Sequence, residues 1–505
     1  MENILYFGDN LQILREYIKD NSVDLIYLDP PFKSGKDYNI LYKEPDGEKS
    51  IAQIKAFEDT WHWSNESEEN FDWLIKNSNI SLIEFLKNFR RFLGENDIMA
   101  YLTMMSIRLL ELRRVLKETG SMYLHCDPTA SHYLKILMDS IFSTKFFRNE
   151  IIWCYRGYEH NKSYYNRKHD VILFYTKTDK YCFNYRNILE PLSEETIKKY
   201  KYTDSSGNYR LRGRNIKGSQ FKQKTDLSPE DEAKYKDLIY RQYMTDGILP
   251  RDWFILDFIN QASKERLGYQ TQKPLELLKK IILASSNEGE VVLDPFCGCG
   301  TTIDAAISTN RKWLGIDITH LAIHLIKKRI KDKYGESIDY KVVGEPTDLA
   351  GAIALAQNNK YQFQWWALSL VDARPAEEDR KMGADKGIDG VKYFKDSLDG
   401  STIRKIIIQV KSGNIGVKDI RELITVTDQN DGVMGVLIIL NEPTFPMKRE
   451  AISAGYYFCD YIKQKYPKIQ ILTIKELFSG KRIEYFNISD ATFKVAEKHI
   501  DKLFN

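Results

Sequence analysis

Cysteine is scarce in this 505-residue sequence, which contains only Cys126, Cys154, Cys182, Cys297, Cys299 and Cys459. These residues are scattered and form no CxxC pair, so we expect neither a disulfide framework nor a structural zinc site. A long apolar run that could cross a membrane is also missing. The first residues, MENILYFGDN, lack the basic and apolar regions of a secretory signal. We therefore expect a cytoplasmic protein with no membrane partner.

The chain has little net charge, only +3, but this charge is unevenly placed. Residues 151–225 contain 16 lysines and arginines against 7 aspartates and glutamates, a local charge of +9 that leaves −6 for the rest. Aromatic residues are interleaved with these charges, and Arg210, Arg212 and Arg214 alternate as they would along one face of a strand. The pattern is typical of a surface that binds a polyanion. On charge alone, a solvated basic hairpin explains it equally well.

Apolar periodicity changes repeatedly along the first 335 residues, where segments typical of strands alternate with segments typical of helices. The expected strands cover 3–8, 23–30, 120–127 and 312–319, residues 290–300 are expected as a strand followed by a loop, and the expected helices cover 10–18, 130–142, 273–286 and 301–310. This alternation predicts an α/β fold with a doubly wound, mostly parallel sheet. Ligands of such sheets bind at the carboxyl ends of the strands, which is where the tetrapeptide DPPF at 29–32 stands.

The strongest local signal is VVLDPFCGCGTT at 291–302, a buried strand followed by a glycine-containing loop and the start of a helix. Gly298 and Gly300 allow a ligand to approach the backbone, and the helix start offers unpaired amides, which together predict a nucleotide-type site. Asp317 follows the next strand, where an acidic residue is expected to bind ribose hydroxyls. A dinucleotide site has similar spacing, although the glycines do not form GxGxxG. We interpret Cys297 and Cys299 as small residues of the loop, not as nucleophiles or metal ligands.

Three motifs, in chain order, resemble the β-class amino-methyltransferases of DNA, which use S-adenosylmethionine: DPPF at 29–32, TQKPLELL at 271–278 and LDPFCGCGTT at 293–302. The resemblance covers residues 1 to about 335 and implies a Rossmann-like methyltransferase domain. In this class the target recognition region lies between the catalytic motif and the cofactor loop, which is where the basic segment falls. It therefore implies double-stranded DNA as the partner of that segment.

The resemblance also assigns roles to individual residues. It implies that the methionine part of the cofactor is held by Thr271, Lys273, Asp294, Phe296, Gly298 and Gly300, its ribose by Asp317, and that Gly8 and Asp9 lie near its adenine ring. Asp29 would accept one N–H of the target amino group and the carbonyl of Pro30 the other, with Pro31 adding rigidity and Phe32 stacking on the base.

A base in that pocket must leave the duplex. A cysteine nucleophile is missing from the motif, which argues against carbon-5 cytosine methylation. In the family an aspartate at the position of Asp29 favours adenine N6, and cytosine N4 is the alternative.

A different unit is expected after residue 335. A connector with one helix precedes a buried helix in YQFQWWALSLVDA, and the strand of TIRKIIIQVKSG ends in Gln409 and Lys411. With Asp389 on a neighbouring strand end, these residues could hold Mg²⁺ and orient a water for attack on phosphate. Residues 355–480 thus resemble the PD-(D/E)XK nucleases in their Q-x-K form, as in Mrr-type restriction domains. Gln364 stands where such domains often carry an acid, and an inactive exposed hairpin is the alternative.

The domain organisation that follows has five parts: 1–150 and 269–335 as the catalytic and cofactor-binding parts of the methyltransferase, 151–268 as the target recognition region, 336–360 as a linker, and 361–505 as the nuclease-like domain. We expect a site-specific adenine-N6 methyltransferase with a Mg²⁺-dependent restriction endonuclease-like tail, and an oligomer is possible. The alternatives are a cytosine-N4 methyltransferase, a tail that only binds DNA or a partner protein, and, more remotely, a dinucleotide oxidoreductase.

Overall fold

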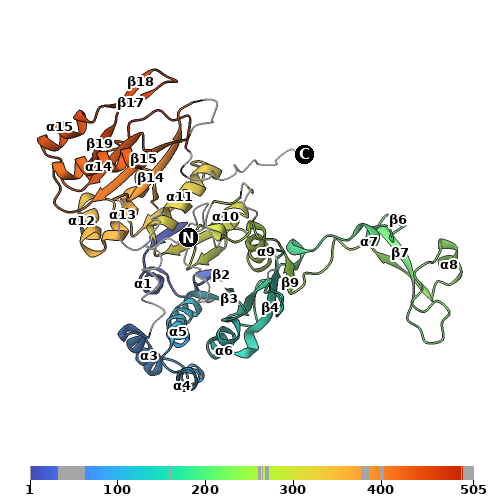
Figure 1. Ribbon diagram of the computed structural model, residues 1–505. Helices are drawn as coiled ribbons and strands as arrows, with labels where there is room; N and C mark the ends of the chain where they lie inside the picture. Colours follow the sequence, from blue (N-terminus) through green and yellow to red (C-terminus); the bar gives the residue numbers. More distant parts are fainter. Residues whose placement is uncertain are drawn as a thin grey trace. The chain divides into compact units, whose positions relative to one another are not determined.

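The computed structural model describes residues 2–31, 63–157, 161–259, 263, 265–267, 272–376, 387–397, 403–490 and 492. Phe32 and Thr271, to which the sequence assigns roles in base stacking and cofactor binding, lie outside these residues. Contacts divide the chain into two compact units, of which the smaller is Phe183–Asp252 and the larger contains the remainder. Figure 1 shows the chain coloured along its sequence, with labels on many of the helices and strands.

A nine-stranded sheet of order β12-β1-β11-β10-β2-β3-β5-β4-β9 is the centre of the larger unit. Its strands are β1 (Ile4–Phe7), β2 (Val23–Leu28), β3 (Leu116–Cys126), β4 (Phe147–Cys154), β5 (His169–Thr176), β9 (Trp253–Ile255), β10 (Val291–Asp294), β11 (Lys312–Asp317) and β12 (Lys341–Val343). Every neighbouring pair from β12 to β3 is parallel, as is β4 with β9, whereas β5 is antiparallel to both β3 and β4. The predicted α/β class with a mostly parallel sheet is confirmed.

Helices and cores lie on both faces of this sheet, because side chains alternate across a strand. On β2, Ile26 and Leu28 belong to one core, and Leu25 and Tyr27 belong to the other. The first core includes side chains of α1 (Asn10–Tyr17), α3 (Asn65–Asn77), α4 (Ile80–Leu93), α5 (Asp97–Val115) and α6 (Ser131–Phe142). The second includes side chains of α9 (Leu275–Ser285), α10 (Thr301–Ser308) and α11 (His320–Tyr334).

The smaller unit is an antiparallel sheet of order β6-β7-β8, made of β6 (Tyr202–Asp204), β7 (Gly207–Gly213) and β8 (Ile239–Tyr243). It also contains the short helices α7 (Glu194–Ile197) and α8 (Pro229–Lys234). Only glycine fits at the position of Gly213, because a Cβ there would lie 1.6 Å from the carbonyl oxygen of Phe221. Strands β5 and β9 and the end of β4 lie within 151–268 but belong to the large sheet, so the compact part of the expected target recognition region is Phe183–Asp252.

A second sheet, of order β13-β14-β15-β16-β19, follows in the C-terminal part. Its strands are β13 (Arg374–Pro375), β14 (Gly390–Lys395), β15 (Ile403–Lys411), β16 (Met434–Ile439) and β19 (Ile469–Thr473), with β20 (Ser489–Asp490) beside β14 and a separate hairpin of β17 (Tyr456–Cys459) and β18 (Gln464–Pro467). One face packs α12 (Leu349–Asn358), α13 (Lys360–Ser369) and α16 (Ile474–Phe478), and the other packs α14 (Val417–Gln429) and α15 (Phe445–Ser453). This part therefore has its own cores.

Four other features considered in the sequence can be compared with the structure. The tryptophan-rich helix is α13, and Trp365 and Trp366 are buried. The connector contains the expected helix, α12, but also β12, which extends the large sheet beside β1. All six cysteines are free thiols. Among the described residues, no helix combines the length and the apolar composition needed to span a membrane.

Candidate active site

The acidic residue of the DPPF motif lies at the carboxyl end of β2 and is ion-paired. Every residue of β2 is buried, and Asp29 follows it directly. Lys273 Nζ lies 2.5 Å from Asp29 Oδ2, and both side chains are less than one fifth exposed. Burial acts to lower the pKa of Lys273, but the charges of Asp29 and Asp170 outweigh it and raise that pKa above its ordinary value. The sequence places Lys273 at the methionine moiety of the cofactor, whereas its observed contact is with the proposed catalytic carboxylate.

A buried hydrogen-bonded chain connects the neighbouring strands behind Asp29. Tyr27 Oη lies 2.8 Å from His125 Nδ1, and His125 Nε2 lies 3.1 Å from Asp170 Oδ2. The other oxygen of Asp170 accepts a hydrogen bond of 3.2 Å from Tyr155 Oη. Burial acts to raise the pKa of Asp170, but His125 and Lys273 lower it overall. This chain was not recognised from the sequence, where its local signal is the polar His125 within the buried end of β3.

The cofactor loop has the predicted strand–loop–helix geometry. Strand β10 ends at Asp294, whose Oδ1 accepts a 3.0 Å hydrogen bond from the amide of Phe296. Gly298 and Gly300 have φ angles of +48° and +76°, which side chains with a Cβ rarely adopt. A Cβ on Gly300 would also lie 2.7 Å from Ile326 Cγ1. Both glycines are therefore required by the loop itself, before any ligand is considered.

Two buried carboxylates lie at the same edge of the sheet, because β10 and β11 are parallel neighbours. Asp317 accepts hydrogen bonds from the amide of Gly298 at 3.0 Å and from the amide and hydroxyl of Thr319, each at 2.9 Å. Burial raises the pKa of Asp294 to about 7 and that of Asp317 to about 6. Within the described part of the chain, neither forms an ion pair. Such carboxylates fit a ligand that brings a cation and hydroxyl donors, as S-adenosylmethionine does with its ammonium and ribose.

Asp9 lies beside Asp317, since the amide of Gly8 donates to the carbonyl of Asp317 at 3.0 Å. Its carboxylate caps α1 through the amide of Leu11 at 2.9 Å and binds Arg108 Nη2 at 2.6 Å. The Asp9 carboxylate thus has a structural role in addition to its predicted position near the adenine ring.

Arg108 also reaches the cofactor loop through a second residue of α1. Its Nε donates to Asn10 Oδ1 at 2.6 Å, and Asn10 Nδ2 donates to the carbonyl of Pro295 at 2.9 Å. Asn10 and Arg108 were not recognised from the sequence, because their partners are far away along the chain.

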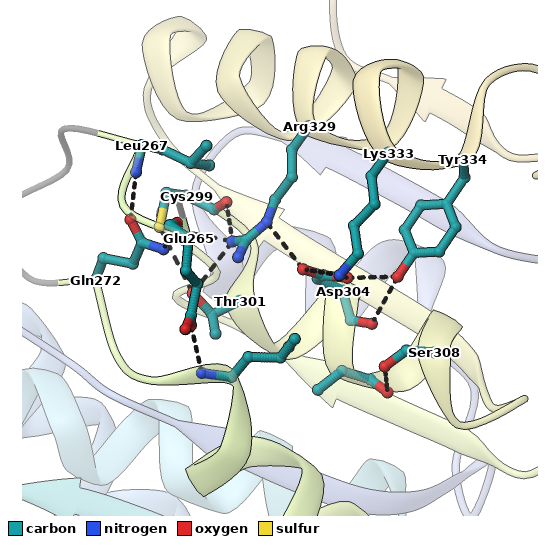
Figure 2. A network of polar contacts seen from close by, with 12 residues as sticks. Glu265, Leu267, Gln272, Cys299, Thr301, Asp304, Ser308, Arg329, Lys333 and Tyr334 are labelled. Atoms are coloured by element: carbon teal, nitrogen blue, oxygen red, sulfur yellow. Dashed lines mark hydrogen bonds and ion pairs between the residues drawn. The ribbon is translucent and has the colours of Figure 1, made fainter. Parts of the chain in front are cut away.

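A second buried arginine supports the loop from α11, as Figure 2 shows. Arg329 Nη1 donates to the carbonyl of Cys299 at 3.0 Å and to Thr301 Oγ1 at 3.2 Å, and its Nε lies 3.2 Å from Asp304 Oδ2. Asp304 binds two further side chains of the same helix, Lys333 and Tyr334. The first residues of α10 are thereby fixed to α11 behind the cofactor loop.

Burial raises the pKa of both loop thiols, Cys297 and Cys299. A buried thiol with a raised pKa is a poor nucleophile and a poor metal ligand. This agrees with the interpretation of both cysteines as small residues of the loop.

The nuclease-like residues Asp389 and Gln409 lie side by side, because the amide of Asp389 donates to the carbonyl of Ile408 at 3.0 Å. Asp389 Oδ1 accepts from Gln364 Nε2 at 2.8 Å, and its Oδ2 accepts from the amide of Val410 at 2.7 Å. Gln364 thus reaches the same carboxylate from α13. Lys411 ends β15, two residues beyond Gln409.

Gln409 is fully buried, and its Nε2 donates to the carbonyl of Gly387, whereas its Oε1 has no hydrogen-bond partner among the described residues. Nor do those residues contain a group of three or more His, Cys, Asp or Glu that could hold a metal ion. Glu422 on α14, missed by sequence reasoning, also approaches: its Oε1 lies 3.0 Å from where a Cβ on Gly387 would be. Carboxylate and amide oxygens are ligands that suit Mg²⁺, so Asp389 and Gln409 fit that ion.

Arg210 and Arg212 lie on β7 and are partly exposed, while their neighbours Tyr209 and Leu211 are buried in the core of the small unit. The two arginines therefore share one face, as the alternation predicts. Strand β7 ends at Gly213, and Arg214 lies one residue beyond it.

Comparison with known proteins gives two family matches. Residues 23–328 match the N6_N4_Mtase family, described as DNA methylase, and residues 355–460 match the Mrr_cat family, described as restriction endonuclease. Type II methyltransferase M.EcaI of Enterobacter cloacae is 27% identical over 359 residues, which are 65% of this chain and 69% of the relative. DNA adenine methyltransferase YhdJ of Escherichia coli K12 is 27% identical over 325 residues, 64% of this chain and 81% of the relative. The structure of PvuII DNA methyltransferase (cytosine-N4-specific) superposes with a TM-score of 0.36 and 13% identity, over 65% of this chain and 86% of that one.

Proposed function

Because the chain belongs to the DNA methylase family of N6 and N4 methyltransferases and also carries an Mrr-like restriction endonuclease domain, we propose that it methylates adenine at N6 in a specific sequence of double-stranded DNA. The observation that carries this proposal is the Asp29 carboxylate at the carboxyl end of β2, held by Lys273 at 2.5 Å. This ion pair fixes the position of the carboxylate, as an acceptor for an amino group requires.

The proposed role of Asp29 follows from the chemistry of the exocyclic amino group that is methylated. The lone pair of an exocyclic amino group is delocalised into the base, which makes the nitrogen a weak nucleophile. When Asp29 accepts one N–H and the carbonyl of Pro30 accepts the other, the nitrogen moves towards tetrahedral geometry and its lone pair is directed away from both acceptors. Asp29 can also accept the proton that leaves the nitrogen after methyl transfer. Phe32 is proposed to stack on the flipped base.

S-adenosylmethionine supplies an electrophilic methyl group when it is bound. We assign Asp294 to its ammonium group and Asp317 to its ribose hydroxyls, because both carboxylates are buried without a cation in the described structure. Gly298 and Gly300 keep the loop free of side chains, Phe296 and Thr271 complete the methionine side, and Asp9 lies on the adenine side. Lys273 is assigned to the proposed catalytic carboxylate, because it is ion-paired with Asp29.

Adenine is favoured over cytosine by Asp29 and by the similarity to the E. coli relative named an adenine methyltransferase. The test is to methylate DNA with the purified enzyme, digest it to nucleosides and identify the modified one by mass. We expect N6-methyladenosine in its deoxy form. Deoxy-N4-methylcytidine would assign the alternative reaction, and an unmodified digest in the presence of bound cofactor would refute the proposal.

For the C-terminal domain we propose Mg²⁺-dependent cleavage of DNA that lacks the methyl mark, so that the chain both modifies and restricts. Asp389 and the buried oxygen of Gln409 would hold the ion, and Lys411 would orient the attacking water. The alternative is a domain that only binds DNA or a partner. Incubation of unmethylated and premethylated plasmid with the purified chain and Mg²⁺ or Mn²⁺ separates the two, because a binding domain leaves both plasmids intact.

A further inference from the structure

The hairpin of β7 and β8 in the small unit has two faces of different chemistry. Arg210 pairs with Gln242 across the strands, and Arg212 pairs with Tyr240. These four residues share the face opposite the core, which is formed by Tyr209, Leu211, Phe221, Leu227 and Ile239. We call Arg210, Arg212, Tyr240 and Gln242 the outer face. Strand β7 has seven residues and is labelled in Figure 1.

The charges on the two faces are handled differently. Arg241, on the core face, lies 2.7 Å from Glu232 and 2.8 Å from Asp204, so its charge is neutralised within the protein. Arg210 and Arg212 form no ion pair with any described residue, and the structure describes every residue of Phe183–Asp252. Their positive charge is therefore available to an anionic partner.

Gln242 fixes the orientation of both arginines. Its Oε1 accepts from Arg210 Nε at 3.0 Å and from Arg212 Nη1 at 3.4 Å. The guanidinium carbon of Arg210 also lies 5.0 Å from the centre of the Tyr200 ring, which restrains the plane of the group. With Nε occupied, the two Nη groups of Arg210 remain together at the end of the side chain as a pair of parallel donors.

A pair of parallel donors matches one base edge particularly well. In the major groove, guanine presents two adjacent acceptors, O6 and N7, and a bidentate arginine is the commonest specific contact to it. The major groove is wide enough to admit a two-stranded β-ribbon such as β7–β8. A phosphate can also accept from both donors of a guanidinium, and the binding measurements below distinguish that contact from a contact with guanine.

We propose that Arg210, positioned by Gln242, reads a guanine of the recognition sequence through the major groove. This inference rests on the proposed DNA methylation. Gln242 is a positioning residue, since it acts through the arginine, and it was not recognised from the sequence. The recognition sequence must then contain a G·C pair. The preference of the enzyme for this pair should be lost when Arg210 or Gln242 is changed.

The experiment is to map methylated sites, by sequencing that detects modified bases, in DNA exposed to the wild-type chain and to variants. Arg210→Lys should lower the preference for the cognate G·C pair at one position by about five- to a hundredfold, because one bidentate contact is lost. Gln242→Leu should relax the same position, and Gln242→Glu, which keeps an acceptor, should restore it. Lys236→Ala removes an exposed charge of the same unit and should leave the sequence preference unchanged.

A second measurement tests the contact itself. Replacing that guanine by 7-deazaguanine removes the N7 acceptor and should weaken binding of a duplex to the wild-type chain about tenfold, but have little effect on Arg210→Lys. The inference is overturned if the methylated sequence contains no guanine, or if Arg210→Lys weakens binding to all sequences equally and reduces the salt dependence, as loss of a phosphate contact would. Absence of any methylation by the wild-type chain would overturn the proposed function as well, and is recognised without the variants.

Discussion

The affinity for S-adenosylmethionine should depend on pH through Asp294. Burial, together with the charges of Asp29 and Asp317, raises the pKa of this carboxyl to about 7. The group is therefore mostly protonated at pH 6 and mostly ionised at pH 8. Only the ionised form attracts the ammonium of the cofactor, so affinity should increase as the pH rises towards 7 and level off above it.

The magnitude follows from the ionised fraction. With a pKa of about 7, this fraction grows about 25-fold between about pH 5.5 and 7.5, so the dissociation constant should fall by about that factor, or about 1.9 kcal/mol. Asp317 has a pKa of about 6, so it should make the cofactor affinity depend more steeply on pH at the acidic end of this range. Without cofactor, the free energy of unfolding has the opposite pH dependence. The raised pKa of Asp294 stabilises the fold at low pH, and this contribution is lost as the pH rises through about 7.

Isothermal titration calorimetry at several pH values measures the affinity, and repeating it in two buffers of different ionisation enthalpy counts the protons released. We expect close to one proton released per cofactor near pH 6. Asp294→Asn should bind more weakly and lose most of the pH dependence, while its thermal unfolding shows that the fold is intact. A wild-type affinity that is constant from pH 5.5 to 7.5, or an unchanged pH dependence in Asp294→Asn, would refute the assignment.

Three further outcomes are expected. Asp29→Asn should reduce methyl transfer by at least a hundredfold while the calorimetric affinity for the cofactor stays within a few-fold; a parallel loss of both would contradict the separation of roles. Lys411→Ala should abolish Mg²⁺-dependent cleavage and leave methyl transfer near the wild-type rate, and a variant that still cuts would place the nuclease centre elsewhere. Arg329→Met should lower the free energy of unfolding by about 3 kcal/mol, because Asp304 loses a buried charge partner; urea unfolding should show no such loss for the exposed Lys331→Met on the same helix.

Local patterns explain which features could be predicted from the sequence. The glycine loop, Asp317 and the end of β2 each belong to a short stretch whose backbone geometry restricts the residues allowed. The ion pair of Lys273 with Asp29 joins residues 244 positions apart, and no local rule connects them. The same holds for Arg108, whose partners lie on another helix.

The limits of the target recognition region were also beyond local reasoning. Its basic and aromatic composition runs without a break from β4 into Phe183–Asp252, although β4 belongs to the large sheet. Basic and aromatic composition indicates which kind of partner a surface can bind. Whether a strand joins a sheet depends instead on pairing with another strand that is far away along the chain.

The pairing of β2 with β10 has a consequence for how the protein is made. Leu25 pairs with Val292, so the centre of the large sheet joins strands that leave the ribosome far apart in time. Such non-local pairing slows folding, and strands that are synthesised early keep unpaired edges until their partners are made. The C-terminal sheet begins only at Arg374, after β12 has completed the first sheet. During synthesis, every copy can therefore finish the domain that marks DNA before the domain proposed to cut it exists.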